Sequence, residues 1–147
     1  MPDIGLASAP VSVRHIATPG LTEPPGASWT NCMVIGQEVV LSGVTARGND
    51  GTPIGGANAG QQAKAIFDRI AAQLKAAGGD LCNVYKLVIY VTDMRFKDDV
   101  NAMRAAAFQP LYPASTFVAV NGFTFPDLLV EIDAFANLAV NLHSAGA

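Results

Sequence analysis

The sequence predicts a single α+β domain in which two helices pack on one face of one sheet. Its 147 residues fit one globular domain, and half of them are apolar, which is enough for a core. Short stretches rich in β-branched residues alternate with two stretches of helical spacing. No internal repeat or second core pattern is visible. We therefore treat residues 1–147 as one domain, with a loose N-terminal arm at 1–13 and a C-terminal tail at 139–147.

The first half of the chain predicts an ordered loop followed by a hairpin. Residues 19–26 are rich in proline and glycine, which is typical of a loop. Residues 29–41 are rich in Val, Ile and Met and are broken at Gly36 and Gln37, a pattern typical of two strands joined by a turn. The composition of residues 47–51 predicts a further turn.

Residues 60–77 predict an amphipathic helix. Its apolar residues recur at the spacing of one helix face: Ala63, Ile66, Phe67, Ile70 and Leu74. The polar residues are assigned to the other faces: Gln61, Lys64, Asp68, Gln73 and Lys75. Gly78 and Gly79 then supply the left-handed conformation that ends many helices.

The second half predicts a strand, a helix and two further strands. Residues 84–91 are β-branched and aromatic, and residues 97–108 return to helical spacing. Residues 116–120 predict a short strand and residues 128–138 a long one. The predicted order is three strands, a helix, a strand, a helix and two strands.

Composition excludes several classes of function. A net charge of −3 and a pI near 5.1 argue against a nucleic-acid partner, which requires a basic surface. The longest uncharged stretch, residues 105–126, is interrupted by prolines and a glycine, so no membrane span is expected. The N-terminal residues lack the pattern of a signal peptide, and two cysteines are too few for a disulfide framework or a zinc site. We expect a cytoplasmic protein that contains no metal or cofactor. We also expect the protein to bind copies of itself.

Glu131 is the most informative residue. It lies in an apolar strand, and Asp133 two positions later projects from the same face. A carboxylate on a buried face is costly unless it is paired or used, which makes Glu131 a candidate general acid and base whose pKa is raised by its apolar neighbours. Asp133 is expected to be structural or solvent-facing. The alternative for both residues is a face that meets solvent at a subunit edge.

Short segments in a fixed order resemble the reactive intermediate deaminase superfamily, also called Rid or YjgF-type. The resemblance covers about residues 28–138, and no single motif is specific; the order and spacing together carry it. The segments are Trp29-Thr30-Asn31-Cys32, Gly36, Val39-Val40-Leu41-Ser42-Gly43, the Gln62 helix ending at Ala77-Gly78, Asn83-Val84-Tyr85-Lys86-Leu87, Val91-Thr92-Asp93-Met94, Val100-Asn101, Pro113-Ala114, Val118-Ala119-Val120 and Val130-Glu131-Ile132-Asp133-Ala134-Phe135-Ala136.

The resemblance implies a chorismate-mutase-like fold, a homotrimer and a ligand cleft between subunits. Relatives of this type hydrolyse 2-imino or 2-enamino acids to 2-keto acids and ammonia without a metal or organic cofactor. An arginine after Pro-Ala binds the substrate carboxylate, and a glutamate in the last strand activates water. The resemblance matches that glutamate to Glu131 and the helix asparagine to Asn101. Trp29 stands where the family has a tyrosine in the cleft, so the aromatic character is kept and the phenol group is absent.

The chain departs from the pattern at the substrate carboxylate. Ser115 stands where the arginine is expected, Val44 replaces a glutamine, and Arg104 replaces a tyrosine on the second helix. The loss of a bidentate charged contact costs roughly 2–5 kcal/mol of carboxylate binding. Either Arg104 restores the cation, or the ligand lacks a carboxylate at this place; we favour the second alternative. Ser115 is expected to orient the ligand and not to act as a nucleophile, because no histidine is placed to activate it.

Two functional hypotheses follow. In the first, the chain is a divergent hydrolase or deaminase that adds water to an imine, an enamine or a related unsaturated catabolite, with Glu131 as acid and base and Ser115, Trp29, Asn101 and Arg104 at the ligand. In the second, a homotrimer binds a small metabolite in its clefts without converting it. A ribonuclease activity is disfavoured, because nine basic residues show no clustering.

Overall fold

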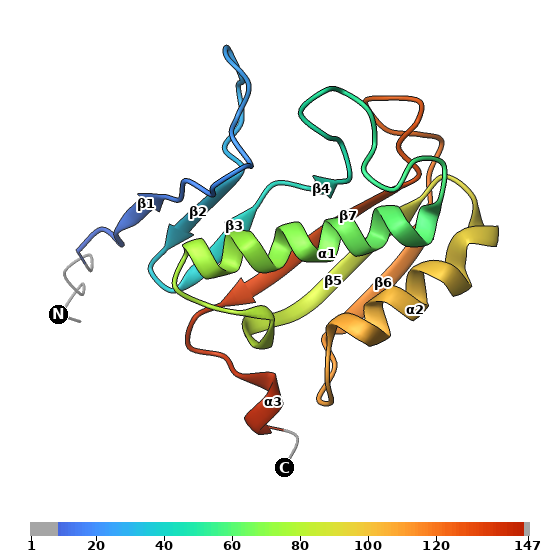
Figure 1. Cartoon of the computed structure of the whole chain (residues 1–147). Helices are drawn as coiled ribbons and strands as arrows, with labels where there is room; N and C mark the ends of the chain where they lie inside the picture. The colour runs from blue at the N-terminus through green and yellow to red at the C-terminus, as the bar shows by residue number, and fades with distance from the viewer. Residues whose placement is uncertain (1–8, 146–147) are drawn as a thin grey trace, which may run out of the picture.

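A single mixed sheet forms the centre of the molecule (Figure 1). A computed structural model describes residues 9–145. The sheet has seven strands, with the order β1-β2-β3-β7-β5-β6, and β4 also pairs with β7. All pairs are antiparallel except β5 with β6, which is parallel. The strands are β1 (Val13–His15), β2 (Cys32–Ile35), β3 (Glu38–Leu41), β4 (Val44–Thr45), β5 (Val84–Val91), β6 (Ala114–Ala119) and β7 (Val130–Asn137).

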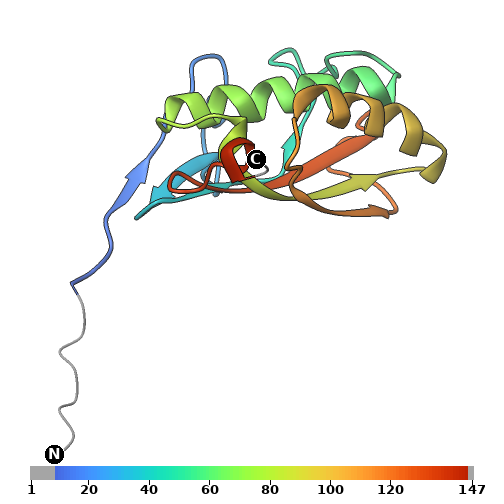
Figure 2. The same ribbon diagram turned by 90° about the horizontal axis from the view of Figure 1, so that it is seen from below.

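Two helices, α1 (Ala59–Ala76) and α2 (Lys97–Ala107), cover one face of the sheet and leave the other face open (Figure 2). Short 3₁₀ turns at Leu81–Asn83 and Met94–Phe96 precede β5 and α2, and α3 (Leu142–Ala145) follows β7. Asn58 caps α1 by accepting a hydrogen bond from the Gln61 amide, and Gly78 follows its end at φ +94°, as predicted.

The core lies between the sheet and α1. Ile66, Ile70 and Leu74 of α1 are fully buried, and each contributes about 1.5–3 kcal/mol through the removal of apolar surface from water. Along β7, buried residues such as Ile132 alternate with partly exposed ones such as Glu131. This alternation directs Glu131 toward the open face.

The sequence predictions of element type are confirmed, with shifted boundaries. The hairpin, the two helices and the strands at 84–91 and 128–138 are present. The predicted strand 116–120 is β6, which begins two residues earlier, at Ala114. One prediction was wrong: Gln73 is buried and does not lie on an outer face of the helix. β1 begins at Val13, the last residue of the predicted arm, and the predicted tail contains α3. Residues 1–8 and 146–147 of the arm and tail lie outside the described residues.

Gln62 is a polar residue on the apolar side of α1, and its side chain forms hydrogen bonds with two loops. Its side chain is fully buried, and its amide group donates to the carbonyl oxygens of Gly56 (2.7 Å) and Asp127 (3.0 Å). Its carbonyl oxygen accepts from the Leu129 amide at 2.9 Å. The loops before α1 and before β7 are therefore held together at one end of the helix.

Candidate active site

Ser42 and Gly43 separate strand β3 from strand β4, and a cavity opens beside this break. Both β3 and β4 pair with β7, and the two residues between them belong to neither strand. The cavity has a volume of about 630 Å³, within the range of roughly 300–1,000 Å³ for small-molecule sites. Its walls come from the loop before β2, the β3–β4 break, α1, and the loop before β7.

Glu131 lines this cavity, and the break at Gly43 makes room for its carboxylate. A side chain at Gly43 would collide with the Glu131 Oε1 atom and would lie 3.0 Å from Asp133 Oδ1. The two carboxylates therefore face the same piece of backbone, which confirms the prediction that they share a face. Only a glycine at position 43 leaves the observed position of Glu131 free.

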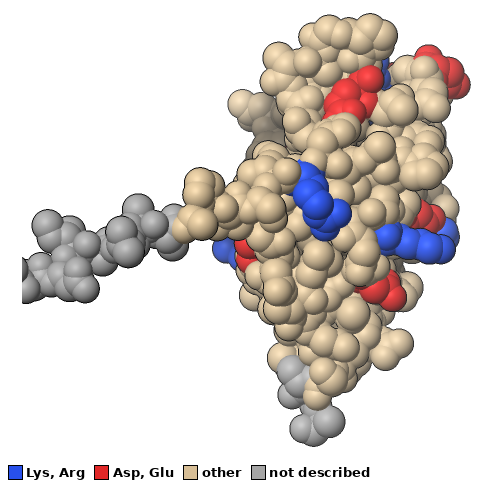
Figure 3. All heavy atoms as spheres, turned by 90° about the vertical axis from the view of Figure 1, so that its left-hand side faces the viewer, with Lys and Arg blue, Asp and Glu red and all other residues tan. Residues whose placement is uncertain are grey.

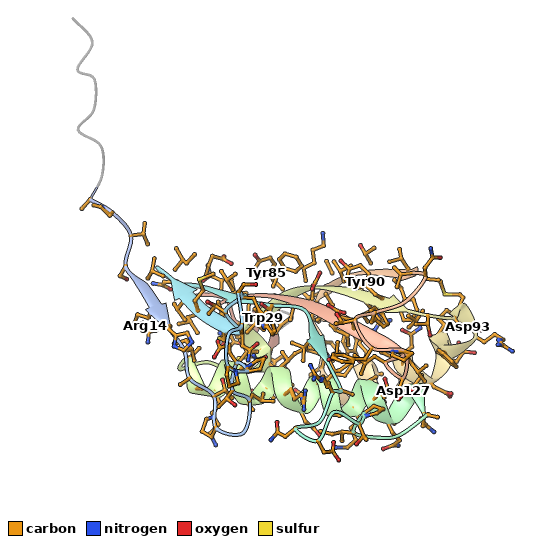
Figure 4. The ribbon with its side chains drawn as sticks, turned by 90° about the horizontal axis from the view of Figure 1, so that it is seen from above. Arg14, Trp29, Tyr85, Tyr90, Asp93 and Asp127 are labelled. Atoms are coloured by element: carbon orange, nitrogen blue, oxygen red, sulfur yellow. The ribbon has the colours of Figure 1, made fainter. Side chains whose placement is uncertain are left out.

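Burial, and secondarily the negative charge of Asp133, raise the pKa of Glu131 above its ordinary value. Asp133 accepts a hydrogen bond of 2.8 Å from the Tyr90 hydroxyl. Tyr90 lies on the face of the sheet away from α1 (Figure 4), and its strand position is opposite Glu131. Asp133 is thus held by a hydrogen bond beside Glu131, a structural role that agrees with the prediction. The carboxyl group of Glu131 is suited to proton exchange with a ligand.

Trp29 also lines the cavity and comes from the loop before β2. Half of its surface is exposed, and its indole nitrogen donates to Asn31 Oδ1 at 3.1 Å. The structure thus brings Trp29 and Glu131, two of the predicted site residues, to one cavity. The indole offers a flat apolar surface to a ligand there.

The other three predicted residues lie elsewhere in the chain, around α2 and β6. The Arg104 guanidinium donates to the Ser115 hydroxyl at 2.7 Å, so a cation stands beside Ser115. Arg104 thus reaches the position where the family arginine is expected, as one of the two alternatives requires; a role for it in ligand binding stays a prediction. Asn101 lies on the same helix, and its buried Oδ1 atom has no hydrogen-bond partner within the described residues. None of these three residues lines the cavity of Glu131.

The polar residues of the cavity wall that sequence reasoning missed include two arginines and a glutamine: Arg47, Arg69 and Gln73. Arg69 donates to the carbonyl oxygens of Thr45 (2.8 Å) and Arg47 (2.5 Å), and Thr45 is the cross-strand neighbour of Glu131. The guanidinium of Arg47 stacks on the Phe125 ring, 3.8 Å from its centroid. A signal was present: Arg69 and Gln73 follow Gln62 at helical spacing, so polar residues recur on one stripe of α1.

Gln73 is expected to reduce stability where it stands. It is 5% exposed, its Oε1 atom has no hydrogen-bond partner among the residues that the structure describes, and its Nε2 atom makes one long contact of 3.5 Å with the Asn31 carbonyl. A buried unpaired polar group costs about 1–3 kcal/mol. Gln73→Met should therefore raise the free energy of unfolding by about 1 kcal/mol, measured by urea denaturation. Gln61→Met, on the exposed side of α1, is the matched control, and an equal gain there would contradict this explanation.

The described residues contain no group of three or more histidine, cysteine or acidic side chains that could hold a metal ion. Nor, over residues 9–145, does any helix have the length and apolarity needed to cross a bilayer. Cys32 is fully buried, and burial raises the pKa of its thiol to about 11, so this cysteine is protonated near neutral pH.

Comparison with known proteins identifies the family. The model of the endoribonuclease L-PSP family matches residues 21–138. PA3499 of Pseudomonas aeruginosa, a protein of unknown function, is 41% identical, with a TM-score of 0.83 over 90% of this chain and 96% of that one. Rv2704 of Mycobacterium tuberculosis, a YjgF/YER057c/UK114 family member, is 30% identical, with a TM-score of 0.72 over 86% and 99%. The yeast protein MMF1, mitochondrial, is 28% identical over 88% of this chain and 92% of its own length. The chain belongs to this family, the Rid or YjgF-type superfamily.

Proposed function

We propose that this protein hydrolyses an imine, an enamine or a related unsaturated small-molecule catabolite, without a metal or cofactor, and releases ammonia. The observation that carries the proposal is Glu131, a half-buried carboxyl group with a raised pKa at the wall of a ligand-sized cavity. A general base of this kind works best when its pKa lies nearer to the working pH than that of a free carboxylate.

The proposed reaction needs one proton carrier. The Glu131 carboxylate removes a proton from water while the water oxygen bonds to the C=N carbon, and the protonated Glu131 gives this proton to the imine nitrogen. The resulting carbinolamine gives its hydroxyl proton to the Glu131 carboxylate, which passes it to the nitrogen as the C–N bond breaks, so the nitrogen leaves as ammonia. The products are a carbonyl compound and ammonia, so that one water is consumed for each imine.

The assembly that we propose is a homotrimer with a ligand site between neighbouring subunits. Four apolar side chains, each more than one third exposed, lie on the open face of the sheet: Ile35, Val40, Val118 and Phe135. An exposed apolar face of this kind is typical of a protein that associates with copies of itself. In the trimer, Arg104, Ser115 and Asn101 of one subunit would complete the cavity that holds Glu131 and Trp29 of another.

The trimer makes a direct prediction for the open face. The wild-type protein should sediment as three copies of the 15.2-kDa chain, and Phe135→Asp should sediment as a monomer, because it places a charge in an apolar interface. Sedimentation velocity at micromolar concentration measures both. Lys64→Gln, on the exposed side of α1, is the control and should remain trimeric. A monomeric wild-type protein would contradict the proposed assembly.

The proposed activity is tested by ammonia release from freshly generated 2-imino acids and from uncharged or aromatic enamines. Release above the uncatalysed rate supports a hydrolase. Tight binding in calorimetry without any product after prolonged incubation favours the alternative, a trimer that binds a small metabolite without converting it. This alternative is motivated by Ser115, which stands where the family arginine is expected.

A small-molecule ligand suits the charge of the molecule better than RNA does, although the family description names an endoribonuclease. The net charge is −3, and the face drawn in Figure 3 carries isolated charged side chains on a mostly uncharged surface. Both cysteines are free, which supports a reducing compartment, and we propose the cytoplasm.

A further inference from the structure

We infer that the cavity of Glu131 contains a second subsite, formed by Arg47 and Arg69, that binds the carboxylate of an elongated ligand. The inference rests on the proposed function for the position of the reacting carbon, and it adds the class of substrate. Such a substrate carries its anionic group at a distance from the carbon that reacts at Glu131.

The two arginines are available for an anion. Both line the cavity, and neither forms an ion pair with an acidic side chain among residues 9–145. Arg69 uses two of its five N–H groups on the carbonyl oxygens of Thr45 and Arg47, which fixes its guanidinium and leaves donors free. Arg47 is exposed and is held above the Phe125 ring.

The charge of Arg69 is also uncompensated. This residue is half-buried, and burial lowers the pKa of its guanidinium. A cation in such a place is stabilised by a bound anion, because desolvation strengthens a charge-assisted hydrogen bond. The neighbouring carbonyl oxygens orient the group but supply only partial charges.

The arrangement of the walls sets the length of the ligand. Arg69 projects from α1, on one face of the sheet, whereas Glu131 projects from β7 toward the other face. A ligand that reaches both must pass the break at Gly43 and span the cavity. A small 2-imino acid carries its carboxylate directly on the reacting carbon, so the proposed substrate, whose carboxylate binds apart from that carbon, is longer. Arg104 and Ser115 lie outside this cavity within one subunit; in the proposed trimer they would reach it only from a neighbouring subunit, at a place distinct from Arg47 and Arg69.

The test is a comparison of an acid with its amide by isothermal titration calorimetry. The probes are 5-oxohexanoate, a carboxylate three methylene groups from a ketone, and 5-oxohexanamide, its neutral counterpart. A charged hydrogen-bond partner contributes about 1.5–3 kcal/mol, so the wild-type protein should bind the acid at least about ten-fold more tightly than the amide. Arg47→Gln should reduce this ratio to near one, and Lys64→Gln should preserve it.

Arg69→Lys is the second variant, because it keeps the charge and removes the planar fork; it should lower the ratio several-fold. The inference is overturned by a ratio near one in the wild-type protein, by a ratio that survives in both Arg47→Gln and Arg69→Lys, or by a loss confined to Arg104→Gln. Since binding needs no turnover, a normal ratio without ammonia release would reject the proposed function and retain the subsite.

Discussion

Replacing Glu131 by glutamine is expected to lower the kcat of imine hydrolysis by about 10²- to 10⁴-fold, the usual contribution of a general acid–base group. Glutamine keeps the size of the side chain but can neither take a proton from water nor return one. The measurement is ammonia release against pH. The wild-type rate should rise with pH through the raised pKa of Glu131, which lies above the ordinary value of 4.5, and this acid limb should disappear in Glu131→Gln.

The stability of the same variant separates catalysis from folding. Because the pKa of Glu131 is higher in the folded protein, the stability that its neutral form contributes is fully present below the ordinary value of 4.5 and is lost as the pH rises through the folded pKa. Glutamine is neutral at every pH, so Glu131→Gln should be at least as stable as the wild-type protein at pH 7. Unchanged activity in this stable variant would reject the mechanism.

Asp133→Asn is the companion variant to Glu131→Gln. It removes the like charge that raises the pKa of Glu131, so the acid limb should move to lower pH while turnover continues. An equal loss of kcat in both variants would show that Glu131 has no separate role.

Gly43→Ala is expected to lower kcat/KM by about 10²-fold with little change in stability, because a misplacement of about 1 Å in an active site has an effect of this size. The backbone at Gly43 does not require glycine, since its φ is not among the positive values. The added methyl group would instead collide with the Glu131 carboxylate. That carboxylate ends a flexible side chain and can turn away, so folding is spared and proton transfer is not.

The matched control for this change is Gly122→Ala. Position 122 has open space around an added methyl group and no positive φ. It should retain both activity and stability. A Gly43→Ala variant with full activity would mean that the carboxylate works from a different position.

The parts of the fold that were predictable are those coded by local pattern. The spacing of Ile66, Ile70 and Leu74 identifies α1 because all three bury the same face. The break at Gly36 identifies the β2–β3 hairpin, because it separates two apolar runs that each form a strand. In contrast, β1 has three exposed residues, and β4 has only two residues. Neither strand has a hydrophobic pattern of its own, and both form only because a longer strand offers a free edge.

The site was predictable only where the sequence carries a conflict. A carboxylate inside an apolar strand singles out Glu131, and no structure was needed to notice it. Arg47 gave no signal, because an arginine in a loop is usually solvated, and Arg69 gave only the weak one of a polar stripe on α1. Their meeting in one cavity depends on how α1 crosses the sheet. The contact between Arg104 and Ser115 likewise depends on the distance between a helix and a strand.

The attachment of two loops to α1 by Gln62 determines which end of the cavity can admit a ligand. Three hydrogen bonds make the segments before α1 and before β7 one unit with the helix, so this end cannot widen without breaking them. Another wall, which bears Trp29, belongs to the long connection between β1 and β2, and its indole is half-exposed. If the proposed activity holds, we expect a ligand to enter on the Trp29 side, where the half-exposed indole would be the first surface that it meets.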